Sequence, residues 1–216
     1  MNVKIFKEPG SAITHFIGML MALIAGIPFI IKASQGSSLV LISSLIYIAS
    51  MVLLYAASST YHFFDISEKV NKCLKKIDHM MICVLIAGTY TPYCLLVIKQ
   101  TFGIVVLAII WSFALIGIII KAFWITCPKW FSSILYIGMG WTCIIALPRL
   151  WNGLTPAAFG WLLAGGIIYT IGGVIYALKI PWFDNKFKNF GLHEIFHLFV
   201  MGGSVCHYIS LYFYVI

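Results

Sequence analysis

The sequence predicts an all-α, polytopic membrane protein that folds as a bundle of seven transmembrane helices. Of its 216 residues, 62% are apolar and only 9% are charged, and the mean hydropathy is +1.03. These values are typical of an integral membrane protein and exclude a soluble domain. The apolar residues also gather in charge-free stretches of about 20 residues, the length that a helix needs to cross a bilayer. We therefore expect a multi-pass protein of the cell membrane.

Seven such stretches follow one another along the chain, and each is expected to form one helix. Pro28, Pro92 and Pro148 fall inside three of them and should bend those helices, which membrane helices tolerate. The connections are short, so the chain 1–216 is interpreted as one domain without an internal boundary. The expected spans run over residues 11–32, 40–64, 77–98, 102–121, 130–149, 157–179 and 191–214.

The basic residues predict the orientation of the bundle. If the N-terminus is cytoplasmic and the C-terminus lies outside, eleven of the 14 lysines and arginines fall in cytoplasmic segments. This asymmetry follows the positive-inside rule, and it favours an odd number of spans. The cytoplasmic set is Lys4, Lys7, Lys69, Lys72, Lys75, Lys76, Lys121, Lys129, Lys179, Lys186 and Lys188, and the outer set is Lys32, Lys99 and Arg149.

The net charge of +8 does not indicate nucleic-acid binding. The basic residues are scattered through the loops rather than clustered in a stripe, so cytoplasmic loops and anionic lipid headgroups explain them better. The six cysteines lie far apart and form no C-x-x-C pair. We interpret them as small packing residues, not as disulfides or thiolate metal ligands. Membrane lipids are the expected partners.

A histidine pair stands at the start of the seventh stretch. His193 and His197 are four residues apart, so they share one face of a helix. Two imidazoles at the mouth of a membrane helix are costly to desolvate without a partner, and a metal ion would satisfy both. His62 lies at the cytoplasmic end of the second stretch, at the same expected depth, and offers a third nitrogen.

These three imidazoles predict a zinc site on His62, His193 and His197, with Zn²⁺ as the expected cofactor. Three protein ligands and one open position are typical of a catalytic zinc, whereas a closed structural site takes four protein ligands. Imidazole ligands favour zinc over harder cations, although the sequence leaves iron and copper open.

Asp78 and Ser58 are the candidate catalytic residues. Asp78 opens the third stretch at the same end, where a carboxylate can serve as general base for a metal-activated water. Its alternative is an ion pair with Lys75 or Lys76 at the headgroups. Ser58 precedes the histidine of its stretch by one turn and can donate a hydrogen bond to a substrate carbonyl. Its alternative is a bond to the backbone carbonyl of Leu54.

The first stretch opens with further polar residues, of which Glu8, Ser11 and His15 are possible accessory residues of the site. Glu8 and His15 are expected either to pair with each other across two turns or to serve in capping and packing. Two other histidines receive structural interpretations. We expect His79 to be interfacial and His207 to be a hydrogen-bonded core histidine.

These residues carry a resemblance to the haemolysin III family. That family is the bacterial branch of the progestin and adipoQ receptors and is related more distantly to the alkaline ceramidases. The resemblance covers nearly the whole chain, from about Glu8 to Tyr208. It rests on Glu8-x-x-Ser11-x-x-Thr14-His15, Ser58-x-x-x-His62, Asp78 and His193-x-x-x-His197, which occur in the order of the family's motifs.

The resemblance implies a seven-helix bundle with a zinc ion inside the membrane, near its cytoplasmic side. By the same resemblance, the ligands are His62, His193 and His197, with Ser58 and Asp78 beside the metal-bound water. One departure is Ser11, where many bacterial relatives carry asparagine. It puts a hydrogen bond of the first helix in doubt but leaves the ligands untouched.

Three hypotheses for the function follow. The first is a zinc-dependent hydrolase of a lipid amide or ester, with a ceramidase-like reaction and a role in membrane homeostasis. The second is a non-enzymatic sensor or regulator of membrane state, in which zinc only holds helices together. The third is a cytolysin, as the family name suggests. A chain that is hydrophobic throughout argues against the soluble-to-inserted transition that a pore-former needs.

Overall fold

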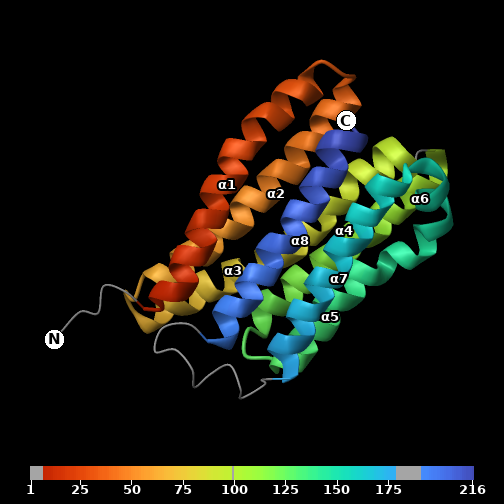
Figure 1. Cartoon of the computed structure of the whole chain (residues 1–216). Helices are drawn as coiled ribbons and strands as arrows, with labels where there is room; N and C mark the ends of the chain where they lie inside the picture. Colours follow the sequence, from red (N-terminus) through yellow and green to blue (C-terminus); the bar gives the residue numbers. More distant parts are fainter. Residues whose placement is uncertain (1–6, 99, 179–190) are drawn as a thin grey trace.

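The computed structural model describes residues 7–98, 100–178 and 191–216. Within these ranges the chain is helical and has no strand. Seven helical segments are long and apolar enough to cross a membrane, and they lie side by side in one bundle (Figure 1). The predicted all-α seven-helix architecture is confirmed. The predicted orientation stays a prediction, and five of its lysines, Lys4, Lys99, Lys179, Lys186 and Lys188, lie outside the described residues.

The first two helices form an antiparallel pair, α1 over Pro9–Ser34 and α2 over Ser38–Phe63. The Ser37 side chain caps α2 by accepting a hydrogen bond from the backbone N–H of Val40. Glycines allow the close approach, because a Cβ atom on Gly18 would lie 3.1 Å from the Tyr55 ring. Helix α1 continues through Pro28 without interruption.

The third helix, α3, begins earlier than expected. It runs over Glu68–Pro92, so the four lysines that we assigned to a cytoplasmic loop, Lys69, Lys72, Lys75 and Lys76, lie on a helix. Charge-free stretches mark only the part of a helix that can enter the hydrocarbon. The helix itself begins at its N-cap, where Ser67 accepts a hydrogen bond from the backbone N–H of Val70. Glu68 follows in the first turn, where its negative charge interacts favourably with the helix dipole.

Two prolines mark departures from α-helical geometry. Directly after Pro92 the chain forms a π-helical segment, η1, over Tyr93–Ile98. Helix α4 then covers Gln100–Phe123. The expected fifth span is divided into α5 (Lys129–Trp141), a 3-10 segment η2 (Thr142–Ala146) and α6 (Leu147–Gly153). Pro148 has no N–H to donate to the preceding turn, so the regular hydrogen bonding is lost before it.

The last two helices, α7 (Pro156–Leu178) and α8 (Leu192–Tyr214), pack closely along their length. Glycines on α7 permit this contact, because a Cβ atom on Gly172 would lie 2.6 Å from the Phe199 Cβ. Helix α8 also lies against α1. The outer faces of the bundle expose large apolar side chains such as Ile24 and Ile134, as lipid contact requires.

This arrangement brings the polar ends of several helices together. Helices α1 and α8 begin at the same end of the bundle at which α2 ends (Figure 1). Two backbone hydrogen bonds join the start of α1 to the end of α2. The N–H groups of Lys7 and Glu8 donate to the carbonyl oxygens of Phe63 and His62, at 3.3 and 2.9 Å. Residues that are distant in the sequence therefore meet at this end.

Candidate metal centre

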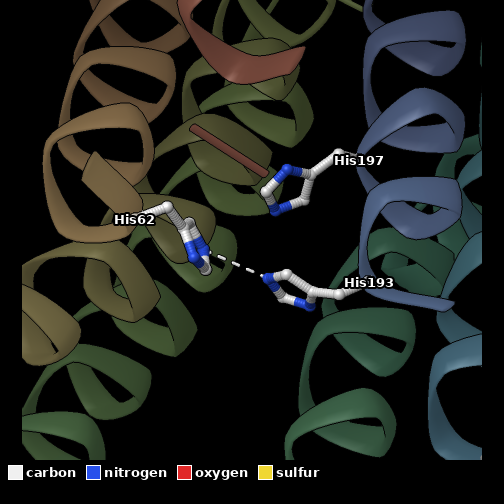
Figure 2. A group of neighbouring side chains, drawn as sticks. All are labelled: His62, His193 and His197. Carbon is white, nitrogen blue, oxygen red and sulfur yellow. Dashed lines mark hydrogen bonds between the residues drawn. The ribbon is translucent and has the colours of Figure 1, made fainter. Parts of the chain in front are cut away.

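Three histidine rings converge at this end of the bundle. His62 comes from the last turn of α2, and His193 and His197 come from the first turns of α8. Figure 2 shows the three rings pointing toward one another. The Nε2 atoms of His62 and His193 are 3.1 Å apart, and one ring nitrogen from each of the three residues lies within 4.8 Å of the others. His62 and His197 are each only 2% exposed.

The spacing of the nitrogens fits a bound metal ion. A zinc–nitrogen distance of about 2.0–2.1 Å separates two ligands of a tetrahedral site by roughly 3.3 Å. The 3.1 Å between His62 and His193 is close to that value, and the nitrogen of His197 lies within 4.8 Å of both. Two imidazole nitrogens facing each other at this distance also need a proton or a cation between them.

Glu8 orients the first of these rings. Its Oε2 atom lies 2.6 Å from His62 Nδ1, which leaves His62 Nε2 to face the cluster. The hydrogen bond from His62 lowers the pKa of Glu8 to about 2, so the carboxylate stays ionised at neutral pH. A carboxylate behind a ligand imidazole sets its tautomer and raises its basicity. The expected pairing of Glu8 with His15 is wrong, because Glu8 contacts the histidine of the neighbouring helix.

Helix α1 also holds the second buried ring. The Thr14 hydroxyl lies 3.1 Å from His197 Nδ1, which again leaves Nε2 for the cluster. His15 stacks on His197, with ring centroids 3.5 Å apart and the planes 9° from parallel. Thr14 appears in the sequence motif, but we assigned it no role, since spacing alone does not show which ring it meets.

Ser11 fixes the start of α8. Its hydroxyl donates to Glu194 Oε1, while Glu194 Oε2 accepts the backbone N–H of Gly191 at 2.8 Å. Glu194 thus closes the first turn of the helix that carries His193 and His197. The accessory role of Ser11 is therefore one of helix placement in this structure, and Glu194 is a site residue that sequence reasoning left unassigned.

Asp78 and Ser58 meet beside the cluster. Asp78 is 7% exposed and Ser58 is 1% exposed. The Ser58 hydroxyl lies close enough to the Asp78 carboxyl group to act on it as a hydrogen-bonding group. Among the described residues, Asp78 forms no ion pair with Lys75 or Lys76, so that alternative is wrong. Among the described residues, Ser58 likewise makes no hydrogen bond to the Leu54 carbonyl oxygen.

The two remaining histidines, His79 and His207, each have a buried Nδ1 atom without a hydrogen-bond partner. The interfacial position of His79 stays a prediction; its Nδ1 atom is buried without a hydrogen-bond partner, and its side chain lines an internal cavity. His207 lies in the core as expected, at 6% exposure, but its Nδ1 atom also has no partner. The expectation of a hydrogen-bonded core histidine is therefore wrong for this nitrogen.

An internal cavity of about 180 Å³ extends from the cluster into the bundle. Ser58, Asp78 and His197 line it at the cluster end, and Ile98 and Leu150 line it toward the other end of the bundle. Most of the remaining lining side chains are apolar. The volume is well above the roughly 10–15 Å³ that holds one water molecule. The histidine cluster therefore lies at one end of a long, mostly apolar cavity inside the bundle.

The fold and the site together define a class: a seven-helix membrane protein with a buried imidazole triad at one end of an internal cavity. More specifically, the chain belongs to the haemolysin III family, since residues 3–208 match the family described as "Haemolysin-III related". The resemblance seen in the sequence is confirmed. The chain is thus a multi-pass protein of the cell membrane.

Three relatives illustrate the breadth of the family. Hemolysin-3 of Bacillus cereus is 39% identical over 217 residues, which cover 100% of this chain and 95% of that protein. A Hemolysin-3 homolog of Bacillus subtilis (strain 168) is 40% identical over 210 residues, or 96% and 94% of the two chains. The Adiponectin receptor protein of Drosophila melanogaster is 24% identical over 242 residues, which cover 95% of this chain and 50% of the receptor.

Proposed function

We propose that the protein is a zinc-dependent membrane hydrolase that cleaves the amide or ester bond of a lipid entering from the inner leaflet. The observation that carries this proposal is the convergence of His62, His193 and His197 within 4.8 Å. Helix α1 already engages Nδ1 of two of these rings, so their Nε2 atoms are available to one ion. Three imidazoles leave the fourth position of a tetrahedral site for the reaction.

The bound zinc would supply Lewis-acid chemistry and lower the pKa of an attacking water. The residues of the chain perform the proton transfers. The Asp78 carboxylate holds that water, accepts its proton and returns the proton to the departing amine or alcohol. The Ser58 hydroxyl donates a hydrogen bond to the substrate carbonyl oxygen, on which negative charge develops. The burial of both side chains beside the cluster supports these roles.

The cavity supports a lipid as the substrate. Its predominantly apolar lining favours a hydrocarbon chain, and its cluster end presents the groups that act on a carbonyl. A chain lying in the cavity also excludes bulk water from the site, which strengthens the electrostatic interactions of Asp78 and Ser58.

A non-enzymatic regulator is the competing function, and one observation favours it. The cluster and its hydrogen bonds join the starts of α1 and α8 to the end of α2. A metal ion bound there would hold three helices together whether or not a reaction takes place. In that case Asp78 would have no role in turnover.

The test is incubation of the purified protein with a lipid extract, with released fatty acid as the readout and zinc content measured in parallel. We expect Asp78→Asn to keep its zinc and to lose product formation by at least the ~100-fold typical of a general base. Asp65→Asn is the matched control, since Asp65 is exposed and bonds Asn71 outside the cavity. Unchanged hydrolysis in Asp78→Asn would refute the assignment. Liposome leakage that persists in His62→Ala would support the cytolysin hypothesis instead.

A further inference from the structure

Buried polar atoms without partners gather around the cavity. In the described part of the chain, six buried side-chain nitrogen or oxygen atoms have no hydrogen-bond partner. Ser44 contributes one of them and does not line the cavity. The other five belong to residues that do: both ring nitrogens of His15, Nδ1 of His79, Nδ1 of His207 and the hydroxyl of Tyr93. A native interior leaves few such atoms unpaired, so this concentration calls for an explanation.

His207 and Tyr93 form a pair far from the metal centre. His207 lies ten residues beyond His197 on α8, which at the helical rise places it about 15 Å deeper. The centroids of the His207 and Tyr93 rings are 6.5 Å apart, and the rings are 6% and 3% exposed. The metal centre therefore does not explain the missing partners of these two side chains.

The polar neighbours of this pair are already engaged. The Tyr169 hydroxyl, whose ring lies beside His207, is bonded to the Ser204 hydroxyl at 2.8 Å. The Ser210 hydroxyl donates to the Ala158 carbonyl oxygen at 2.9 Å. Each of these hydroxyls can still accept a further hydrogen bond, but none of them reaches hydrogen-bond geometry with His207 Nδ1 or with the Tyr93 hydroxyl, so both of these atoms lack a partner beside the cavity.

The pair is also held in place by the surrounding helices. A Cβ atom on Gly165 would lie 2.8 Å from His207 Nε2, so α7 has a glycine where the ring packs. Tyr93 lies in the π-helical segment η1, directly after Pro92. Such π segments frequently occur at functional sites. The packing of the surrounding helices thus holds both side chains beside the cavity.

We propose that Tyr93 and His207 form a second, polar subsite, which takes a hydroxyl group carried in the distal half of a lipid hydrocarbon chain. A hydroxyl can donate to the imidazole nitrogen and accept from the phenol, whereas a methylene satisfies neither. The separation of about 15 Å from the metal centre is half of the ~30 Å hydrocarbon core, which is the depth of one leaflet. The subsite thus lies within reach of a chain whose carbonyl is at the cluster.

The inference rests on the proposed function only in that the ligand is a lipid with its polar end at the metal centre. Oleate and ricinoleate are suitable probes, because ricinoleate is oleate with one hydroxyl added in the distal half of the chain. Binding of these free acids to the detergent-purified protein needs no hydrolysis. We expect ricinoleate to bind about 10-fold more tightly than oleate, the effect of satisfying one buried polar pair.

The variants His207→Leu and Tyr93→Phe should bring the ratio of the two affinities close to one while oleate still binds. Tyr208→Phe is the control, because the Tyr208 hydroxyl donates to the Ala25 carbonyl oxygen and Tyr208 does not line the cavity. Thermal unfolding of each variant shows whether it is folded.

Equal affinity for the two acids in the unaltered protein would overturn the subsite, and so would a ratio that the His207 and Tyr93 variants leave unchanged. Failure to bind either acid would overturn it as well. The absence of hydrolysis with the ricinoleate preference intact would instead refute the proposed reaction alone.

Discussion

Glu8 is predicted to tune zinc affinity through His62. Its carboxylate accepts a hydrogen bond from His62 Nδ1 at 2.6 Å, and its side chain is 45% exposed. Loss of an outer partner of a ligand imidazole costs typically 10- to 100-fold in metal affinity. Glu8→Gln keeps a carbonyl acceptor but removes a charge that solvent partly screens, so we expect the lower end, about 10-fold or ~1.4 kcal/mol. Glu8→Ala removes both and should approach about 100-fold.

The assay is competition for zinc between the purified protein and a chelator of known affinity. Glu68→Gln is the matched control, because Glu68 lies exposed in the first turn of α3, away from the cluster. It should leave the zinc affinity unchanged. If Glu8→Ala binds zinc as tightly as the unaltered protein while His62→Ala does not, the carboxylate does not support the ligand and this reasoning is refuted.

Three further predictions follow from single contacts. Thr14→Val keeps the side-chain shape but removes the hydroxyl beside His197 Nδ1, so zinc affinity should fall about 10-fold in the same competition assay; an unchanged affinity would contradict the contact. Gly172→Ala puts a Cβ atom 2.6 Å from the Phe199 Cβ, and thermal unfolding should show a loss of about 1–3 kcal/mol, whereas Gly166→Ala, which meets nothing within 4 Å, should not. Without metal, the unaltered protein should be more stable than Glu8→Gln, and this difference in the free energy of unfolding should be full above pH 4.5. It should disappear as the pH falls toward about 2, because the folded-state pKa of Glu8 is lowered to about 2. A stability difference that grows on acidification would contradict this prediction.

Composition and spacing were sufficient to predict the seven helices and the convergence of the three histidines. A bilayer sets the length of an apolar span, and an i, i+4 spacing places His193 and His197 on one face. The start of α3 at Glu68 was not predicted, since charged residues end an apolar stretch without ending a helix. The π and 3-10 segments near Pro92 and Pro148 were anticipated only as bends.

The contacts between helices were the part that the sequence did not reveal. Spacing predicts neighbours on one helix, so Glu8 was matched with His15, whereas packing brings it to His62 on α2. The same limit hid the contact of Thr14 with His197. The missing hydrogen-bond partner of His207 Nδ1 was not predicted either, because no sequence pattern marks the cavity that His207 lines.

The central claim is that one zinc ion binds where α2 and α8 meet. The most direct measurement is the metal content of the purified protein, for the unaltered chain and for His62→Ala, with His207→Leu as a control that removes a histidine outside the cluster. We predict about one zinc per chain in the unaltered protein and in His207→Leu, and loss of zinc in His62→Ala. A protein without zinc, or one whose zinc survives His62→Ala, would contradict the account.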